Sequence, residues 1–168
     1  MYLCTRIDNA VLMTKSETYQ QLLPQIQSLV ADEPDMIARM ANVAAVLHDA
    51  FGFWWTGFYR VEHDPANGEQ EGTLVLGPFQ GPIACTRIPY GRGVCGTAWQ
   101  QAQTLVVPNV HQFKGHIACS SASNSEIVVP LIHEGKVIAV LDIDSTDFAA
   151  FDDTDRLYLE QIAMAFTL

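Results

Sequence analysis

The chain has 168 residues, 49% hydrophobic and 17% charged, a composition that excludes a disordered chain and fits one domain with a sizeable core. Its 19 acidic and 9 basic residues give a formal net charge of −10, and no basic cluster interrupts the sequence. Because nucleic-acid binders need a basic footprint to displace counterions, we expect no nucleic acid and no anionic membrane among its partners.

The N-terminal part is expected to hold an extension followed by two helices. Residues 1–12 have no usable periodicity, so we interpret them as a mobile extension of a domain that spans 13–168. Ser16 can cap a first helix, in which apolar residues recur at helical spacing. Pro24 lies inside that pattern and should kink or split the helix. Pro34, at a favoured first helical position, should open a second helix.

The pattern changes to strands and turns after the second helix. Strands or extended segments are expected at FWWTGFYRVE, TLVLGPFQ, ACTRIP, TLVVPNV, SEIVVPLIH and KVIAVLDIDS. Between them, GRGVCGTAWQQAQ begins with glycines and becomes helical, and VHQFKGHIACSSASNS is a long loop of the kind that is usually functional. Asp152 or Asp153 should cap a last helix. This order predicts an α+β fold, a central antiparallel sheet with two N-terminal helices and a C-terminal helix packed on it.

Several functional classes lack their signals in this sequence. There is no GxGxxG and no P-loop, so nothing indicates a cradle for nucleotide phosphates. No apolar run reaches the roughly 18 residues of a spanning helix, and the N-terminus has acidic and polar residues where a signal peptide is apolar. We therefore expect a cytoplasmic protein. In that compartment the four cysteines argue against a structural disulfide framework.

The segment around Gly135 predicts a hairpin that gathers acidic residues. A three-residue loop with glycine last would span 133–135 and place Glu126 opposite Asp142, with Asp144 on the same face. A two-residue loop would instead put Glu126 on the other face. Like charges directly opposite destabilise a sheet, so a cation, a metal or shared protons should compensate them. The alternatives are a solvated sheet edge, a pocket for an ammonium group, or a site for a hard metal ion.

Three of the cysteines lie where chemistry is plausible. Cys95 is at the glycine-rich start of a helix, where exposed N–H groups stabilise a thiolate. Cys119 lies in the long loop near a lysine and a histidine, and Cys85 lies in a strand-like segment. Each of them also fits a small buried hydrophobic side chain. Two further alternatives are a zinc site, in which His116 would join the three cysteines, and cycling between thiols and a disulfide. Cys4 is given no role.

Aromatic residues in the first expected strand add a second candidate surface. Trp55, Gly57 and Tyr59 alternate onto one face of that strand. The two rings would leave a gap with aromatic walls above the glycine, although packing in the core is the alternative for either ring.

The segments GPFQGPIACTRIPYGRGVCGTAW, HIACSSASNSEIVVPL and VLDIDS resemble the free methionine-(R)-sulfoxide reductases, which are built on a GAF domain. The resemblance runs from about Lys15 to the end of the chain. It implies that Cys119 is the catalytic cysteine, that Cys85 resolves its sulfenic acid as a disulfide, and that Cys95 is an auxiliary or alternative resolver. It also implies a reductase of free methionine-(R)-sulfoxide that thioredoxin recycles, with NADPH as the distant electron source, no bound cofactor and no metal.

The same resemblance assigns the substrate site. Glu126, Asp142 and Asp144 match the acidic residues that hold the substrate and help to protonate its oxygen, and Trp55 and Tyr59 resemble the aromatic wall around its methyl group. Family members often pair, which makes a homodimer an implied assembly. Two other functions are compatible with the sequence. One is a GAF module that binds a ligand or senses oxidation without turnover, and the other is a zinc-stabilised binding domain.

Overall fold

The computed structural model describes residues 13–63, 72–117 and 121–166. The predictions for residues 1–12 and for the position of Cys119 therefore lie outside the described residues. In chain order, the elements are α1 (Lys15–Ala31), α2 (Met36–Phe51), β1 (Trp55–His63), β2 (Gly72–Gln80), β3 (Arg87–Pro89), α3 (Gly93–Gln101), β4 (Leu105–Val107), the 3-10 turn η1 (Val110–Gln112), β5 (Ser125–His133), β6 (Lys136–Ser145) and α4 (Asp153–Ala165).

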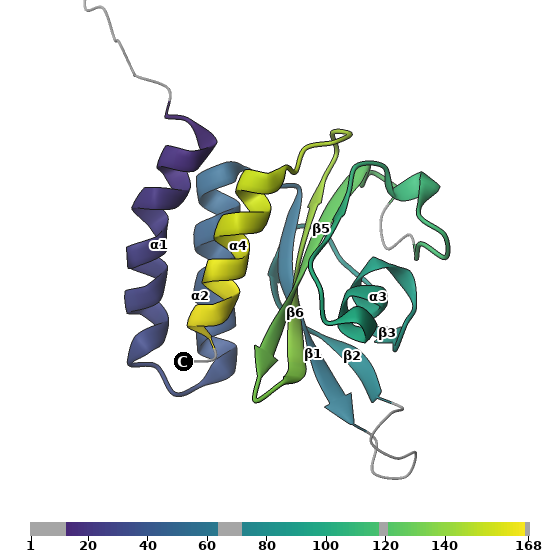
Figure 1. Ribbon diagram of the computed structural model, residues 1–168, viewed down its shortest axis with the longest axis horizontal. Helices are drawn as coiled ribbons and strands as arrows, with labels where there is room; N and C mark the ends of the chain where they lie inside the picture. Colours follow the sequence, from purple (N-terminus) through teal and green to yellow (C-terminus); the bar gives the residue numbers. More distant parts are fainter. Residues whose placement is uncertain (1–12, 64–71, 118–120, 167–168) are drawn as a thin grey trace, which may run out of the picture.

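The strands form one six-stranded sheet in the order β3-β2-β1-β6-β5-β4, and all of its neighbours are antiparallel. On one face α2 and α4 pack against the sheet and α1 packs on these two helices, while α3 covers the opposite face (Figure 1). The predicted α+β architecture is confirmed. Of the two N-terminal helices, however, α2 makes the main contact with the sheet, and α1 forms an outer layer.

The helix starts follow capping chemistry more closely than the sequence pattern indicated. Thr14, not Ser16, caps α1, in a capping box with Glu17. Pro24 does not split α1, and the apolar face of the helix on both sides of it is buried in one core. Asp35 caps α2 and accepts a hydrogen bond from the Ala38 N–H at 2.9 Å, so this helix begins two residues after Pro34. For α4 the expected cap, Asp152, is confirmed.

The β5–β6 hairpin differs from the prediction in two ways that offset each other. Its loop has two residues, Glu134 and Gly135, both with positive φ, and not three. Such a loop alone would turn Glu126 to the wrong face. The register then shifts by one residue at Ile138, which restores the predicted face. Glu126 consequently pairs with Asp144, and not with Asp142 as predicted, while all three acids still share one face.

The sheet separates two apolar clusters. The helical face carries the larger one, which includes Phe58, Ile127, Leu141 and Ile143. The α3 face carries the other, built around Trp55, Tyr59, Cys95, Val128 and Val140. Because side chains alternate along a strand, each acid on the α3 face has a buried aliphatic neighbour on the helical face. The acids are thus set into a scaffold that the helical core holds in place.

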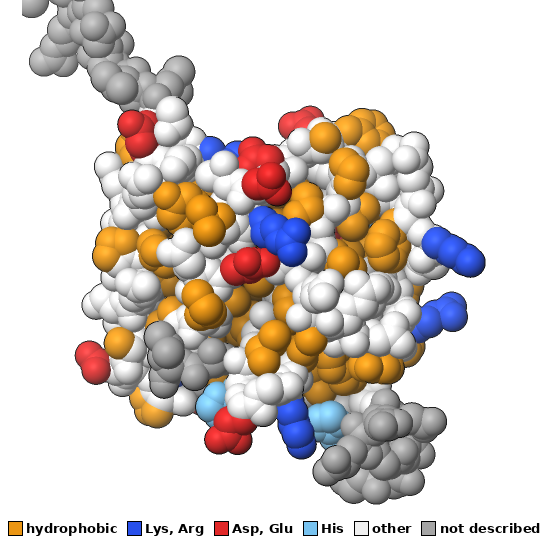
Figure 2. Space-filling model, viewed as in Figure 1, with side chains coloured by type: hydrophobic (Ala, Val, Ile, Leu, Met, Phe, Trp, Pro, Cys, Tyr) orange, Lys and Arg blue, Asp and Glu red, His pale blue; other side chains and the backbone are white. Residues whose placement is uncertain are grey.

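The surface agrees with the charge pattern of the sequence. On the face shown in Figure 2, Lys and Arg side chains are scattered among acidic and apolar ones and do not gather into a patch. Within the described ranges, no helix combines the length and the apolar character needed to cross a membrane.

Candidate active site

A pocket opens on the α3 face of the sheet. Counted out to its mouth, with open solvent included, it takes in about 560 Å³. Strands β1, β5 and β6 form its floor, α3 forms one side, and the segment 82–84 forms another. The predicted substrate residues Trp55, Tyr59, Glu126, Asp142 and Asp144 all line it, together with Cys95. The structure therefore brings together residues that lie far apart in the sequence.

The three acids are buried together. Glu126 and Asp142 are each 6% exposed, and burial, followed by repulsion among the carboxylates, raises the pKa of both well above the ordinary range. Burial also raises the pKa of Asp144, to about 6, although a hydrogen bond with Ser123 acts in the opposite direction. This arrangement favours the protonated forms of the two deeper acids, whereas Asp144 is largely ionised at neutral pH.

One oxygen in this cluster is unpaired. Asp142 Oδ1 is buried and has no hydrogen-bond partner among the residues that the structure describes. A buried polar atom without a partner costs free energy, about 1–3 kcal/mol, so native proteins rarely retain one without a reason. A ligand with a donor group would satisfy this oxygen.

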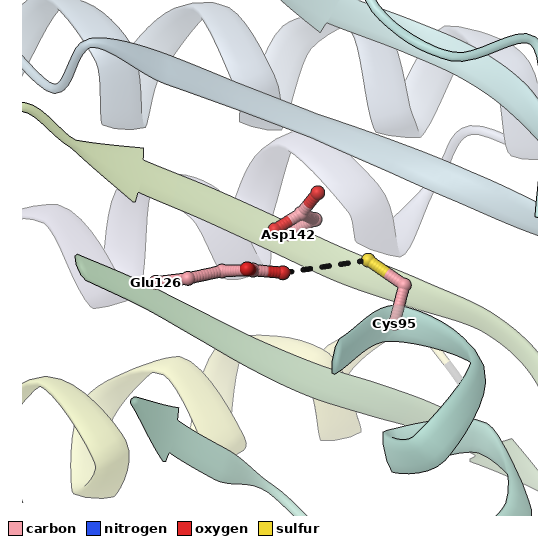
Figure 3. A group of neighbouring side chains, drawn as sticks. All are labelled: Cys95, Glu126 and Asp142. Atoms are coloured by element: carbon pink, nitrogen blue, oxygen red, sulfur yellow. Dashed lines mark hydrogen bonds between the residues drawn. The ribbon is translucent and has the colours of Figure 1, made fainter. Parts of the chain in front are cut away.

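Cys95 does not occupy the environment that the sequence indicated. Its thiol is buried and free, and it points from the first turn of α3 toward the acids (Figure 3). The thiol donates to Glu126 Oε1 at 3.8 Å. Burial, and then the negative charge of Asp142 and Glu126, raises the pKa of Cys95. The helix start therefore does not yield a stabilised thiolate here, because the acids and the loss of solvent outweigh it.

The aromatic wall is present, but the predicted gap is not. An added Cβ at Gly57 would lie 2.5 Å from the Trp55 ring, which shows that the indole folds over the glycine and fills that space. Trp55 Nε1 donates to the Pro82 carbonyl at 3.1 Å, and Tyr59 Oη donates to the Cys85 carbonyl at 3.0 Å. Both rings therefore hold the segment that leads to Cys85 against the sheet.

Cys85 lies just before β3 and outside any strand, in contrast to the prediction, and it is half-buried and disulfide-bonded. A cysteine in a disulfide offers no thiolate to the four-ligand zinc site that the sequence left open. His116 lines the pocket, and burial lowers its pKa. The role predicted for Cys119 remains untested, since residues 118–120 lie outside the described ranges.

Sequence reasoning missed two parts of the pocket. Ser123 is buried and interacts with Asp144, although a serine in a loop gives no signal by itself. The segment Pro82–Ala84 carries Ile83, which is 91% exposed at the pocket. Only the fold brings this segment beside β1.

The fold, one antiparallel sheet with helices on both faces and a pocket on one of them, is that of a GAF domain. The model of the GAF domain matches residues 30–168. The free methionine-R-sulfoxide reductase of Escherichia coli is 49% identical over 89% of this chain and 87% of its own length. GAF domain-containing protein A of Dictyostelium discoideum is 56% identical over 89% and 90% of the two chains.

Solved structures agree with the sequence relatives. The free methionine-R-sulfoxide reductase from Neisseria meningitidis, solved in complex with its substrate, is 55% identical and superposes with a TM-score of 0.84 over 92% of this chain and 89% of that chain. The reduced form of the Staphylococcus aureus protein is 48% identical, with a TM-score of 0.80 over 88% and 92%. The chain thus belongs to the free methionine-R-sulfoxide reductase family of GAF-domain proteins.

Proposed function

We propose that this protein reduces free L-methionine-(R)-sulfoxide to L-methionine and that thioredoxin returns it to the reduced state. The observation that carries the proposal is the buried acidic pocket with its unpaired Asp142 oxygen, beside an aromatic wall. The names of relatives at 49% and 55% identity support the same substrate.

The charge of the pocket favours a free amino acid over a residue within a chain. A free amino acid carries an ammonium group, which a peptide-bound methionine lacks. Asp144, whose pKa is about 6, is mostly ionised at neutral pH and is suited to accept a charge-assisted hydrogen bond from that group. The open Asp142 Oδ1 is a further acceptor for an ammonium donor.

The reduction needs a proton at the sulfoxide oxygen. Burial and mutual repulsion raise the pKa of both Glu126 and Asp142, which favours their protonated forms. A carboxylic acid of this kind can donate to the oxygen as the S–O bond breaks. Trp55 and Tyr59 would contact the apolar end of the same substrate and so orient its sulfur.

The proposed reduction of the sulfoxide has three steps. The Cys119 thiolate attacks the sulfoxide sulfur, oxygen passes to the cysteine as a sulfenic acid, and methionine leaves with two more electrons on its sulfur. The Cys85 thiol then forms a disulfide with Cys119 and releases water. Thioredoxin, a dithiol, reduces that disulfide and is oxidised in turn, with NADPH as the indirect donor. The disulfide-bonded state of Cys85 supports its part in this scheme.

An assay on four substrates tests the proposal. The two sulfoxide epimers of methionine are each supplied free and within a peptide, with thioredoxin, its reductase and NADPH. We expect NADPH consumption with the free R epimer alone. No turnover with any of them would overturn the proposal in favour of a GAF module that binds or senses without catalysis. Equal rates with free and peptide-bound substrate would show that the pocket acids do not recognise the substrate ammonium group.

A second experiment tests the resolving step. The Cys85→Ser variant should release about one methionine per chain and then stall, unless Cys95 replaces Cys85. The double variant with Cys95→Ser separates these outcomes. Sustained thioredoxin-coupled turnover in the double variant would contradict the disulfide scheme.

A further inference from the structure

We propose that the same pocket binds a borderline divalent cation of the Zn²⁺ class through Cys95 Sγ and one carboxylate oxygen each from Glu126 and Asp142, and that this cation and the substrate exclude each other. This ligand set differs from the four-ligand zinc site considered from the sequence, since it contains two acids and a single cysteine. It would make divalent metal a reversible inhibitor of the site.

The geometry of the three side chains supports a shared ligand. One ligand atom from each of Cys95, Glu126 and Asp142 lies within 4.8 Å of the other two, the one such group among the described residues. A tetrahedral zinc ion holds sulfur and oxygen ligands roughly 3.5 Å apart, and Cys95 Sγ already lies 3.8 Å from Glu126 Oε1. Small side-chain rotations would close the remaining distance, and the three groups converge from α3, β5 and β6 (Figure 3).

The unpaired Asp142 oxygen is an independent indication. Asp142 is 6% exposed, and its Oδ1 has no partner within the described part of the chain. If the buried oxygens of the acidic cluster all had hydrogen-bond partners within the cluster, none of them would need a ligand. Here one oxygen stays open inside a pocket that solvent can enter.

The donor types select the class of cation. A sulfur ligand disfavours Mg²⁺ and Ca²⁺, which prefer oxygen alone, and favours Zn²⁺ or Co²⁺. Three protein ligands leave a fourth position for water, as in zinc sites that are not purely structural. The ion would replace the protons that otherwise compensate these buried groups. It would also occupy the carboxylates that the substrate ammonium group needs.

Cobalt absorption tests this site without an activity assay. The full chain with Cys4→Ser is oxidised so that Cys85 is disulfide-bonded, as in the structure, and is titrated with Co²⁺. We expect a saturable thiolate-to-cobalt charge-transfer band that stoichiometric Zn²⁺ abolishes. Cys95→Ser should remove the band completely. Asp142→Asn should raise the Kd for Co²⁺ by about tenfold or more.

A matched control and a competition complete the test. Asp147→Asn changes an exposed acid away from the pocket and should leave the Kd unchanged. Absence of a band in the parent protein, or a band that survives Cys95→Ser, would overturn the site.

Free L-methionine-(R)-sulfoxide should raise the apparent Kd for Co²⁺, and only this competition experiment rests on the proposed function. A cobalt band without reductase activity would refute the proposed function but not the cation site, whereas a band that a true substrate leaves unchanged would overturn the exclusion.

Discussion

Two buried aspartates, one on each side of the sheet, show how differently this protein treats a buried charge. Asp155 on the helical side is fully buried and accepts hydrogen bonds from Lys15 Nζ at 2.6 Å and Tyr19 Oη at 2.9 Å. Asp142 on the α3 side is almost as buried but faces other acids and leaves Oδ1 unpaired. The ion pair and hydrogen bond of Asp155 tie two helices together, whereas the open oxygen of Asp142 is poised for a ligand.

The strand alternation explains how both arrangements coexist. The residues on either side of Asp142, Leu141 and Ile143, are fully buried in the helical core. That packing fixes the backbone of β6, so the strand tolerates repulsion on its other face. We therefore expect the helical side of the sheet to contribute most of the stability and the α3 side to carry the ligand site, and four experiments test this expectation.

The largest effect is expected at the predicted nucleophile. Cys119→Ser should lower turnover of free methionine-(R)-sulfoxide by at least about 10³-fold, because a hydroxyl cannot accept the sulfoxide oxygen in a sulfenic acid. Methionine formed per chain is measured by chromatography. Cys4→Ser, at a cysteine with no assigned role, is the control and should retain activity. Comparable rates in the two variants would remove Cys119 from the mechanism.

The two aspartates should respond in opposite ways to loss of charge. Asp155→Asn should lower the free energy of unfolding by about 2–3 kcal/mol, since it removes the partner of a partly exposed lysine. Asp142→Asn should change it by less than about 1 kcal/mol, because it also relieves repulsion, but should lower kcat/KM at least tenfold. Urea unfolding and steady-state kinetics measure the two effects. Similar destabilisation by both variants would erase the contrast between the faces.

The pocket acids should make stability depend on pH. Asp144 has a pKa of about 6 in the folded chain and about 3.9 when unfolded, so the folded state binds more protons between these values. The stabilisation is therefore complete below about pH 4 and is lost as pH rises through 6, by on the order of 1–3 kcal/mol. Urea unfolding from pH 4 to pH 7 should show a smaller loss in Asp144→Asn than in the parent. Identical pH profiles would contradict this contribution.

The smallest effect is expected beneath the aromatic wall. Gly57→Ala would place a Cβ 2.4 Å from Phe79 Cβ and 2.5 Å from the Trp55 ring, so both the indole and the β2 backbone at Phe79 must move. We expect a loss of about 1–2 kcal/mol in stability, a raised KM and a changed tryptophan emission. Unchanged emission and KM would mean that the position of Trp55 does not matter to the pocket.

The sequence determined the alternation that gathers the site. Once the register of the hairpin is set, the side chains of residues 126, 142 and 144 lie on the same face of the sheet. Residues 55, 57 and 59 share one face of β1 in the same way. The α+β order of elements, the cap at Asp152 and the family resemblance could also be read from it, because these depend on local chemistry and short-range patterns.

The tertiary structure decided the rest. The shift at Ile138 set the pairing of Glu126 with Asp144, and the packing of α3 on the sheet buried Cys95 beside acids from two other strands. A pKa depends on solvent access and on every charge nearby, and those charges come from segments about thirty to fifty residues apart. The local sequence around Cys95 indicated a stabilised thiolate, whereas the assembled pocket holds a protonated thiol, since burial and neighbouring acids are properties of the fold alone.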